Sequence, residues 1–231
     1  MAINVMQRYE MKYLLSDRQT DFLRERLEGN MQADGYGKTS IASLYYDTEN
    51  YRLIRASEEK PPFKEKIRLR SYGLATDASP VFLELKRKAF GVVYKRRIET
   101  TIPQVERFFS GEDGLFDGQI SREITTFRDY YKTLAPSCLI IYDRTAYFEP
   151  DGDLRLTIDE NPRFRTDHLT LTKSMDGISL LRPGWTVLEV KVQEAMPLWL
   201  AETLSQGGIM KASFSKYGEA FRRQLLAVQN Y

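Results

Sequence analysis

The stretch Lys64-Glu-Lys-Ile-Arg-Leu-Arg70 decides the fold of this 231-residue chain. At the two-residue period of a β-strand, four cations fall on one face: Lys64, Lys66, Arg68 and Arg70. Ile67 and Leu69 fall on the other face, together with Glu65. Four neighbouring cations repel one another, so their face requires anions opposite it. A single strand of this kind also fits the solvated face of a half-buried sheet.

The same alternation recurs in five other stretches. Their polar faces carry Arg8, Glu10 and Lys12; Glu84, Lys86 and Lys88; Tyr142 and Arg144; Arg155, Thr157 and Asp159; and Glu189 and Lys191. Solvated faces usually also carry Ser, Thr and Gln, whereas Arg and Lys dominate here. If the strands close into a barrel, the charged faces line its interior. Such an interior would bind a polyanion, and its carboxylates would be available to a divalent metal.

Composition limits the classes of protein that remain. The length and the absence of a linker predict a single domain over residues 1–231. The net charge of only +2 argues against a nucleic-acid partner. The single cysteine, Cys138, excludes an internal disulfide and is expected in the core. The polar beginning and the lack of a long apolar run predict a cytoplasmic protein that does not itself insert into a membrane.

Periodicity and turn residues predict an α+β protein. We expect strands at 6–15, 40–47, 63–72, 80–88, 92–102, 138–148, 153–159 and 185–193. Helices are expected at 17–29 with Ser16 as N-cap, from about 50 to 57, from Pro103 to Gly111, and at 119–133, 198–206 and 216–228. Residues 161–184 carry no clear pattern.

Familiar catalytic motifs are excluded. Gly37-Lys-Thr39 resembles the end of a phosphate-binding P-loop, but position 32 is Gln instead of Gly. The only histidine, His168, cannot form a His-based metal site or triad alone. The charged strands therefore remain as the candidate site. Arginine forks grip phosphate oxygens, and a carboxylate such as Glu189 could hold a metal that phosphate and water complete.

The order of several motifs resembles a known family. They are Arg8-Tyr-Glu-x-Lys12, Leu44-Tyr-Tyr-Asp-Thr48, Lys66-Ile-Arg-Leu-Arg70, Glu84-Leu-Lys-Arg-Lys88, Tyr142-x-Arg144, Arg155-Leu-Thr-Ile-Asp159, Leu188-Glu-Val-Lys191 and Ser213-Phe-Ser-Lys-Tyr217. The set is similar to the catalytic domain of the vacuolar transporter chaperone (VTC) polyphosphate polymerases, which belong to the triphosphate tunnel (CYTH-like) metalloenzymes. The resemblance spans residues 6–222. It implies a closed antiparallel eight-stranded β-barrel with flanking helices.

The resemblance also implies an activity and its residues. The implied enzyme transfers the terminal phosphoryl group of ATP to a growing polyphosphate chain and releases ADP, using Mn²⁺ or Mg²⁺. The catalytic cations would be Lys12, Arg68, Arg70, Lys86, Arg144, Arg155 and Lys191. Substrate-binding groups would be Glu10, Lys66, Lys88, Lys95, Tyr142, Ser215 and Lys216, with Arg96 and Arg97 competing for the role of Lys95. Glu189 would be the metal ligand.

One departure separates the possible activities. Hydrolytic and cyclase members begin with Glu-x-Glu-x-Lys, whereas this chain has Arg8 at the first position. We therefore expect the polymerase branch, acting on ATP and polyphosphate. The alternatives are a tripolyphosphatase or thiamine triphosphatase, and a non-catalytic module that binds polyphosphate or inositol phosphates. The sequence contains neither the membrane nor the phosphate-sensing domain of the fungal polymerases, so product export would require a membrane-protein partner, whose identity is unknown.

Overall fold

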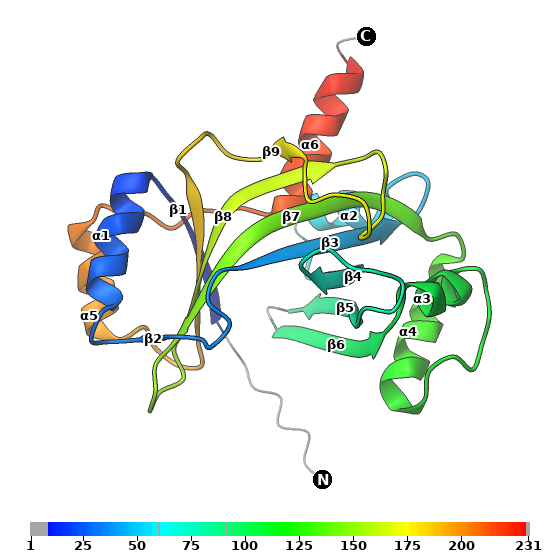
Figure 1. Ribbon diagram of the computed structural model, residues 1–231, viewed down its shortest axis with the longest axis horizontal. Coiled ribbons are helices and arrows are strands. Elements are labelled where there is room, and N and C mark those ends of the chain that lie inside the picture. Colours follow the sequence, from blue (N-terminus) through cyan, green and yellow to red (C-terminus); the bar gives the residue numbers. More distant parts are fainter. Residues whose placement is uncertain (1–8, 60, 91, 230–231) are drawn as a thin grey trace. The chain divides into compact units, whose positions relative to one another are not determined.

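The computed structural model describes residues 9–59, 61–90 and 92–229, with side chains up to residue 224. Six helices and ten strands are present in this part of the chain, and Figure 1 traces them in order. They form two compact units. Unit 1 comprises residues 1–40, 142–162 and 179–215, and unit 2 comprises 41–141, 163–178 and 216–231. The prediction of a single domain stays a prediction.

Unit 1 is built on three paired strands. Strand β1 (Tyr9–Leu15) pairs antiparallel with β10 (Thr186–Val192), which pairs with β8 (Arg155–Arg165). Helices α1 (Asp17–Leu27) and α5 (Leu198–Gln206) lie side by side in Figure 1. Apolar residues of β1, β8 and β10 pack with both helices into one core, which includes Leu23, Leu188 and Leu200. The charged residues of these strands are thereby left on the other face.

Helix α1 begins as the sequence predicts. The Ser16 hydroxyl accepts a hydrogen bond from the Gln19 amide at 3.4 Å. The Gln19 side chain in turn accepts one from the Ser16 amide at 3.1 Å. This reciprocal capping box satisfies two amides at the helix start, and the predicted N-cap is confirmed.

Unit 2 is built on a meander. Strands β3 (Thr39–Asp47), β4 (Phe63–Tyr72), β5 (Val81–Ala89) and β6 (Val92–Thr100) are antiparallel neighbours. Helices α3 (Ile102–Phe109) and α4 (Gly118–Tyr131) supply core residues such as Phe108 and Phe127, which pack with Leu69 and Leu83 of the sheet. The remaining helices of this unit are α2 (Arg52–Glu58) and α6 (Lys216–Gln229).

The hydrogen-bonded strand order is β1-β10-β8-β7-β3-β4-β5-β6, where β7 is Ala135–Phe148. Two-residue strands β2 (Gln32–Ala33) and β9 (Ile178–Ser179) pair with β7 and β8. Within the described ranges no pairing joins β1 to β6, so the predicted closure of the barrel is not confirmed. The large antiparallel sheet with helices confirms the α+β class.

Most predicted elements are confirmed to within a few residues, and two differences have physical causes. Strand β8 continues to Arg165, past the predicted end at 159. Asn161 has a positive φ of 47° before Pro162, so the strand absorbs both residues at a local kink. The short strands β2 and β9 were not predicted, because two residues carry no periodicity. Residues 6–8 of the first predicted strand, including Arg8, lie outside the described residues.

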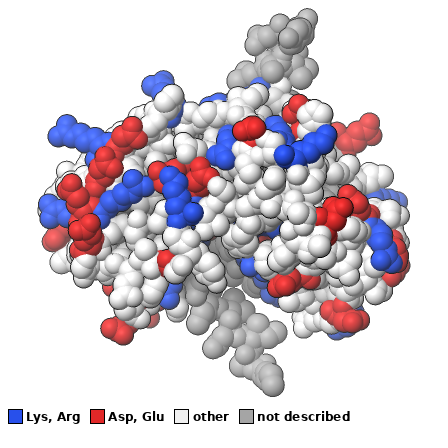
Figure 2. Space-filling model, viewed as in Figure 1, with Lys and Arg blue, Asp and Glu red and all other residues white. Residues whose placement is uncertain are grey.

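No helix in the described ranges is long and apolar enough to cross a membrane. Figure 2 shows Lys and Arg interspersed with Asp and Glu over the visible face. This mixture agrees with the small net charge of +2. Cations are therefore concentrated by strand register and not by an excess over the whole chain.

Candidate functional site

The first candidate group lies in unit 2 and is centred on a buried carboxylate. Four cations contact Glu84, and we call these five residues the Glu84 cluster: Arg68, Arg70, Glu84, Lys95 and Arg97. Strand register explains the grouping, because Arg68, Glu84 and Arg97 are directly opposite one another on β4, β5 and β6. One face of three neighbouring strands thus brings these side chains together.

The contacts divide between the two oxygens of Glu84. Arg68 donates to Oε2 from Nε at 2.9 Å, and Arg70 NH1 lies 3.7 Å from the same oxygen. Lys95 Nζ lies 2.7 Å from Oε1, which also accepts from Arg97 Nε at 2.8 Å. Glu84 is only 1% exposed. A single buried anion therefore orients four cations.

These charges change the pKa values within the cluster. Burial alone would raise the pKa of Glu84, but Arg68, Arg70 and Lys95 outweigh it and hold that pKa far below its usual range. Burial lowers the pKa of Lys95 to about 8, assisted by Arg97 and Arg70 and opposed by Glu84. The Glu84 carboxylate therefore stays ionised at neutral pH, whereas the Lys95 ammonium loses its proton near pH 8.

A second row of cations adjoins this cluster on the same three strands. Lys66, Lys86 and Lys95 are opposite one another on β4, β5 and β6. The Lys66 ammonium lies 5.7 Å from the centre of the Tyr217 ring, a cation–π distance. Lys88 is one step further along β5 and exposed, opposite Lys64. Cations thus continue along the strands beyond Glu84.

Tyr217 fixes the start of α6 beside these rows. Its ring stacks on Tyr45 with centroids 4.3 Å apart, and its hydroxyl donates to Asp47 at 3.0 Å. The same Asp47 carboxylate accepts the amides of Leu53 and Ile54 at 2.9 and 3.0 Å. One buried carboxylate therefore anchors both α2 and the first turn of α6, which begins at Lys216.

The second candidate group lies in unit 1. We call it the Glu189 cluster: Glu10, Lys12, Arg144, Asp159, Glu189 and Lys191. Lys12 Nζ lies 3.1 Å from Glu189 Oε1 and 3.5 Å from Glu10, while Lys191 lies 3.7 Å from Glu189 Oε2. Register again explains the grouping, since Lys12 is opposite Glu189 and Glu10 is opposite Lys191.

Arg144 is the most constrained cation of this group. Its Nε and NH2 donate to the two oxygens of the buried Asp159 at 2.6 and 2.7 Å, and NH2 lies 3.6 Å from Glu189. Burial alone would lower the pKa of Arg144, but Tyr142, Asp159 and Glu189 raise it well above its usual value. The guanidinium is therefore permanently charged and held in one orientation by a bidentate pair.

A divalent metal needs several oxygen ligands, and Glu189 would supply one of them. Among the described residues, no group of three or more His, Cys, Asp or Glu side chains could hold a metal. Mg²⁺, however, is commonly bound by one or two carboxylates, with substrate phosphates and water completing the shell. Thr157 is opposite Glu189, and its buried hydroxyl has no hydrogen-bond partner in the described structure. These residues fit a metal that the substrate itself helps to hold.

The structure groups most of the residues predicted from the sequence, although their roles remain predictions. In unit 1, Lys12, Arg144 and Lys191 all contact Glu189, and Lys12 also contacts Glu10. In unit 2, Arg68, Arg70 and Lys95 all contact Glu84. The competing candidate Arg97 also joins the Glu84 cluster. Arg96 instead pairs with Glu123 at 2.9 Å.

Arg155 is the clearest departure. It is opposite Lys191 in register, but its guanidinium donates to the backbone oxygens of Glu149, Gly152 and Leu154. It also lies 5.5 Å from the centre of the Phe148 ring. In this structure Arg155 therefore closes the turn between β7 and β8. Ser215 immediately precedes α6. Tyr142 is buried, and its ring centre lies 5.0 Å from the guanidinium carbon of Arg144.

Sequence reasoning did not select Glu84 and Asp159 as central residues. Both residues alternate with apolar residues along their strands, so the sequence correctly predicts that they lie on the polar face. Nothing in the alternation distinguishes a carboxylate that organises cations from one that binds a metal. Only the strand register shows that Glu84 is surrounded by Arg68 and Arg97.

The sequence profile of the VTC domain matches residues 7–224. The chain belongs to the VTC domain family. The resemblance inferred from the ordered motifs is thereby confirmed. A search of curated proteins gives no significant match.

Solved structures similar to this VTC domain share its fold at low identity. A candidate adenylate cyclase from Bacillus halodurans aligns with a TM-score of 0.56 and 13% identity, over 91% of this chain and 96% of that one. A candidate adenylyl cyclase from Hippeastrum, described as having a dominant triphosphatase activity, aligns with a TM-score of 0.54 and 20% identity, over 95% and 96% of the two chains. At these identities the similarity concerns the fold.

Proposed function

We propose that this VTC domain is a metal-dependent polyphosphate polymerase, which transfers the terminal phosphoryl group of ATP to a polyphosphate chain and releases ADP. The observation that carries the proposal is the Glu84 cluster. Glu84 gathers four cations on one face of unit 2, and Lys66 and Lys86 continue that face beside Lys95. A chain of phosphates is a ligand with matching charge and length.

The residues of the chain would act by binding and orientation. Arg68 and Arg70 would bind non-bridging phosphate oxygens, because their guanidinium groups are already held in place by Glu84. Arg144, locked on Asp159, would stabilise negative charge that develops on the transferred phosphoryl group. Lys12, Lys191, Lys86 and Lys216 are proposed to contact further phosphates. Closure of the sheet into a barrel stays a prediction.

Glu189 is proposed to hold Mn²⁺ or Mg²⁺ together with the phosphates. A metal bound there would supply charge stabilisation for phosphoryl transfer. The Glu189 carboxylate already faces three cations, so the metal would bind most readily when a phosphate chain competes for Lys12 and Lys191. We therefore expect the affinity of Glu189 for the metal to be higher when a phosphate chain is bound.

A triphosphatase is the second candidate. The Hippeastrum protein with a similar fold is described as having a dominant triphosphatase activity. Against it, Arg8 stands where hydrolytic members have a carboxylate, which leaves one fewer acidic group to activate water. A third possibility is a non-catalytic module that binds polyphosphate.

The deciding experiment incubates the purified chain with ATP and Mn²⁺ or Mg²⁺ and follows ADP, free phosphate and polyphosphate on stained gels. A polymerase gives ADP and long polyphosphate with little free phosphate. Stoichiometric free phosphate without polyphosphate would assign the hydrolase, and no ADP at all would assign the binding module. The Glu189→Gln variant is the control for contaminating activity.

A further inference from the structure

Unit 2 contains a pocket that the proposed function does not use. Its volume is about 450 Å³, and it lies among α2, β4, β5 and α4. No residue of the Glu84 cluster lines it. On β4 it includes Glu65, which by strand alternation faces away from the side that carries Arg68 and Arg70. The volume falls within the range of small-molecule sites.

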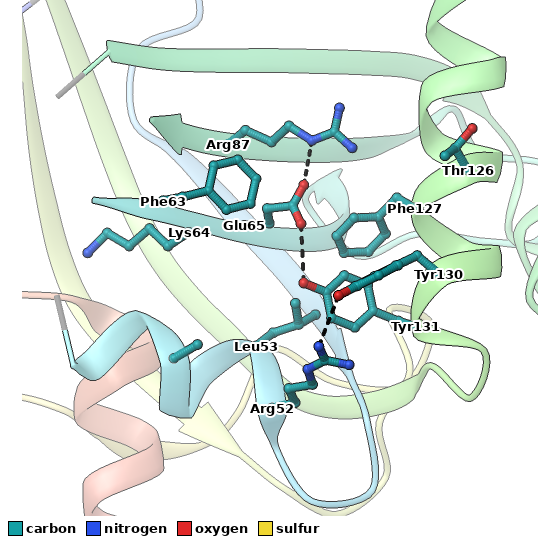
Figure 3. A pocket seen from close by; sticks show the side chains of 11 residues that line it. Arg52, Leu53, Phe63, Lys64, Glu65, Arg87, Thr126, Phe127, Tyr130 and Tyr131 are labelled. Carbon is teal, nitrogen blue, oxygen red and sulfur yellow. Dashed lines mark hydrogen bonds and ion pairs between the residues drawn. The ribbon is translucent and has the colours of Figure 1, made fainter. Parts of the chain in front are cut away.

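Aromatic side chains form much of the pocket wall (Figure 3). Phe63 and Tyr130 are 49% and 63% exposed, so their rings are accessible to a ligand. Tyr131 meets Tyr130 edge-on, with centroids 4.9 Å apart at 88°. Exposed rings of this kind are stacking surfaces for nucleobases, which all have a π face.

A hydrogen-bonded chain holds part of this wall in place. Arg87 Nε donates to Glu65 Oε1 at 2.5 Å, and the Tyr131 hydroxyl donates to Glu65 Oε2 at 3.2 Å (Figure 3). Glu65 is 9% exposed. Arg87 also lies 3.6 Å from Glu123. Two carboxylates therefore balance the charge of Arg87, which makes it a structural group of the wall.

Arg52 is in a different electrostatic situation. Its guanidinium carbon lies 5.3 and 5.2 Å from the ring centres of Tyr130 and Tyr131, and its NH2 donates to the Tyr130 hydroxyl at 3.1 Å. Among the described residues, no carboxylate lies within ion-pair distance of it. This exposed, oriented guanidinium can therefore bind an anion at the pocket without losing a salt bridge.

We propose that this pocket binds a nucleoside monophosphate, with its base against Tyr130 and Phe63 and its phosphate on Arg52. The aromatic walls argue for more than a free phosphate ion, and the Arg52 charge argues against a neutral aromatic ligand. Two other cations line the pocket: Arg87 is paired with Glu65 and Glu123, and the Lys64 ammonium donates to the Ser57 carbonyl at 3.3 Å. We therefore assign the phosphate to the Arg52 guanidinium. The chain would thus carry a nucleotide site on the opposite face of β4 from the Glu84 cluster, whatever reaction the cluster supports.

The test is calorimetric titration of AMP into the full chain without metal, first alone and then with saturating tripolyphosphate, which under the proposed function would occupy the cation rows. The variants are Arg52→Ala and Tyr130→Ala, both at exposed side chains. Two substitutions outside the pocket are the matched controls. Arg122→Ala removes an exposed arginine of α4 and matches Arg52→Ala, and Tyr36→Ala removes a tyrosine that is 86% exposed and matches Tyr130→Ala. Inorganic phosphate, adenosine, GMP and UMP are titrated separately, and circular dichroism verifies folding.

We expect AMP to bind, and each pocket variant to weaken binding by about tenfold or more, as expected for loss of a charged contact or a stacking platform. The controls should bind AMP like the wild type. Absence of AMP binding, equal binding of inorganic phosphate and AMP, or unchanged AMP binding in a folded pocket variant would overturn the proposal. If one variant does not fold, the other decides.

Discussion

Replacing Glu84 by Gln removes the negative charge that contacts all four cations of the Glu84 cluster, while keeping nearly the same volume. Glu84 is 1% exposed and lies within 4 Å of Arg68, Arg70, Lys95 and Arg97. Removing one member of a buried ion pair typically costs about 3–5 kcal/mol, because the remaining charges lose their compensation. For a chain of this length each kcal/mol lowers the unfolding midpoint by about 2–4 °C. The expected decrease is therefore roughly 6–20 °C.

Thermal and urea unfolding followed by circular dichroism would measure this effect at pH 7. The matched control is Glu112→Gln, since Glu112 pairs with Arg107 on the surface and should leave the midpoint unchanged. The pKa of Glu84 is lowered in the folded state, so its stabilisation is present above the unfolded carboxyl pKa and is lost as pH falls. The difference between wild type and Glu84→Gln should therefore narrow in acid. Equal stability of the two proteins at pH 7 would refute the role of Glu84 as organiser of the cations.

Three further predictions concern other residues of the two units. The pKa of Lys95 is about 8, so tripolyphosphate affinity measured by calorimetry should fall as pH rises through 8, whereas Lys95→Arg should flatten this dependence; identical profiles would exclude Lys95 as a ligand. Glu189→Gln should lower turnover of ATP with Mn²⁺ by orders of magnitude while tripolyphosphate binding without metal persists; near wild-type turnover would rule out Glu189 as the metal ligand. Asp47→Asn should reduce the free energy of unfolding by about 1–3 kcal/mol, because the Leu53 and Ile54 amides and the Tyr217 hydroxyl lose a charged acceptor; a wild-type urea midpoint would contradict this anchoring role.

The sequence was sufficient to predict most of the fold because its signals are local. The alternation in residues 64–70 predicted a strand at 63–72, and β4 has the same bounds, Phe63–Tyr72. Ser16 marked the beginning of α1, and the family resemblance is confirmed by the VTC domain match. The extension of β8 was missed because a Pro following Asn normally ends a strand, whereas here the chain kinks and continues.

The candidate site was predictable in its residue types and faces, but not in its pairing. Alternation placed Arg68, Arg70 and Glu84 on polar faces, yet only register shows that Glu84 lies opposite Arg68. The resemblance also implied that Arg155 binds phosphate, whereas in the structure its guanidinium contacts the backbone of the β7–β8 turn. The pocket at Arg52 was not predicted, because it combines α2, β4, β5 and α4, which are separated in the sequence.

The most direct measurement of the central claim is tripolyphosphate binding by the Arg68→Ala, Arg70→Ala double variant, followed by calorimetry at two salt concentrations. Each charged contact contributes about 1.5–3 kcal/mol, so loss of both should weaken binding by at least about a hundredfold. Wild-type affinity should fall as salt rises. The control, Arg24→Ala with Lys38→Ala, removes two cations that pair with Glu160 and should bind like the wild type. Unchanged affinity in a folded Arg68→Ala, Arg70→Ala protein would contradict a phosphate-chain site at the Glu84 cluster.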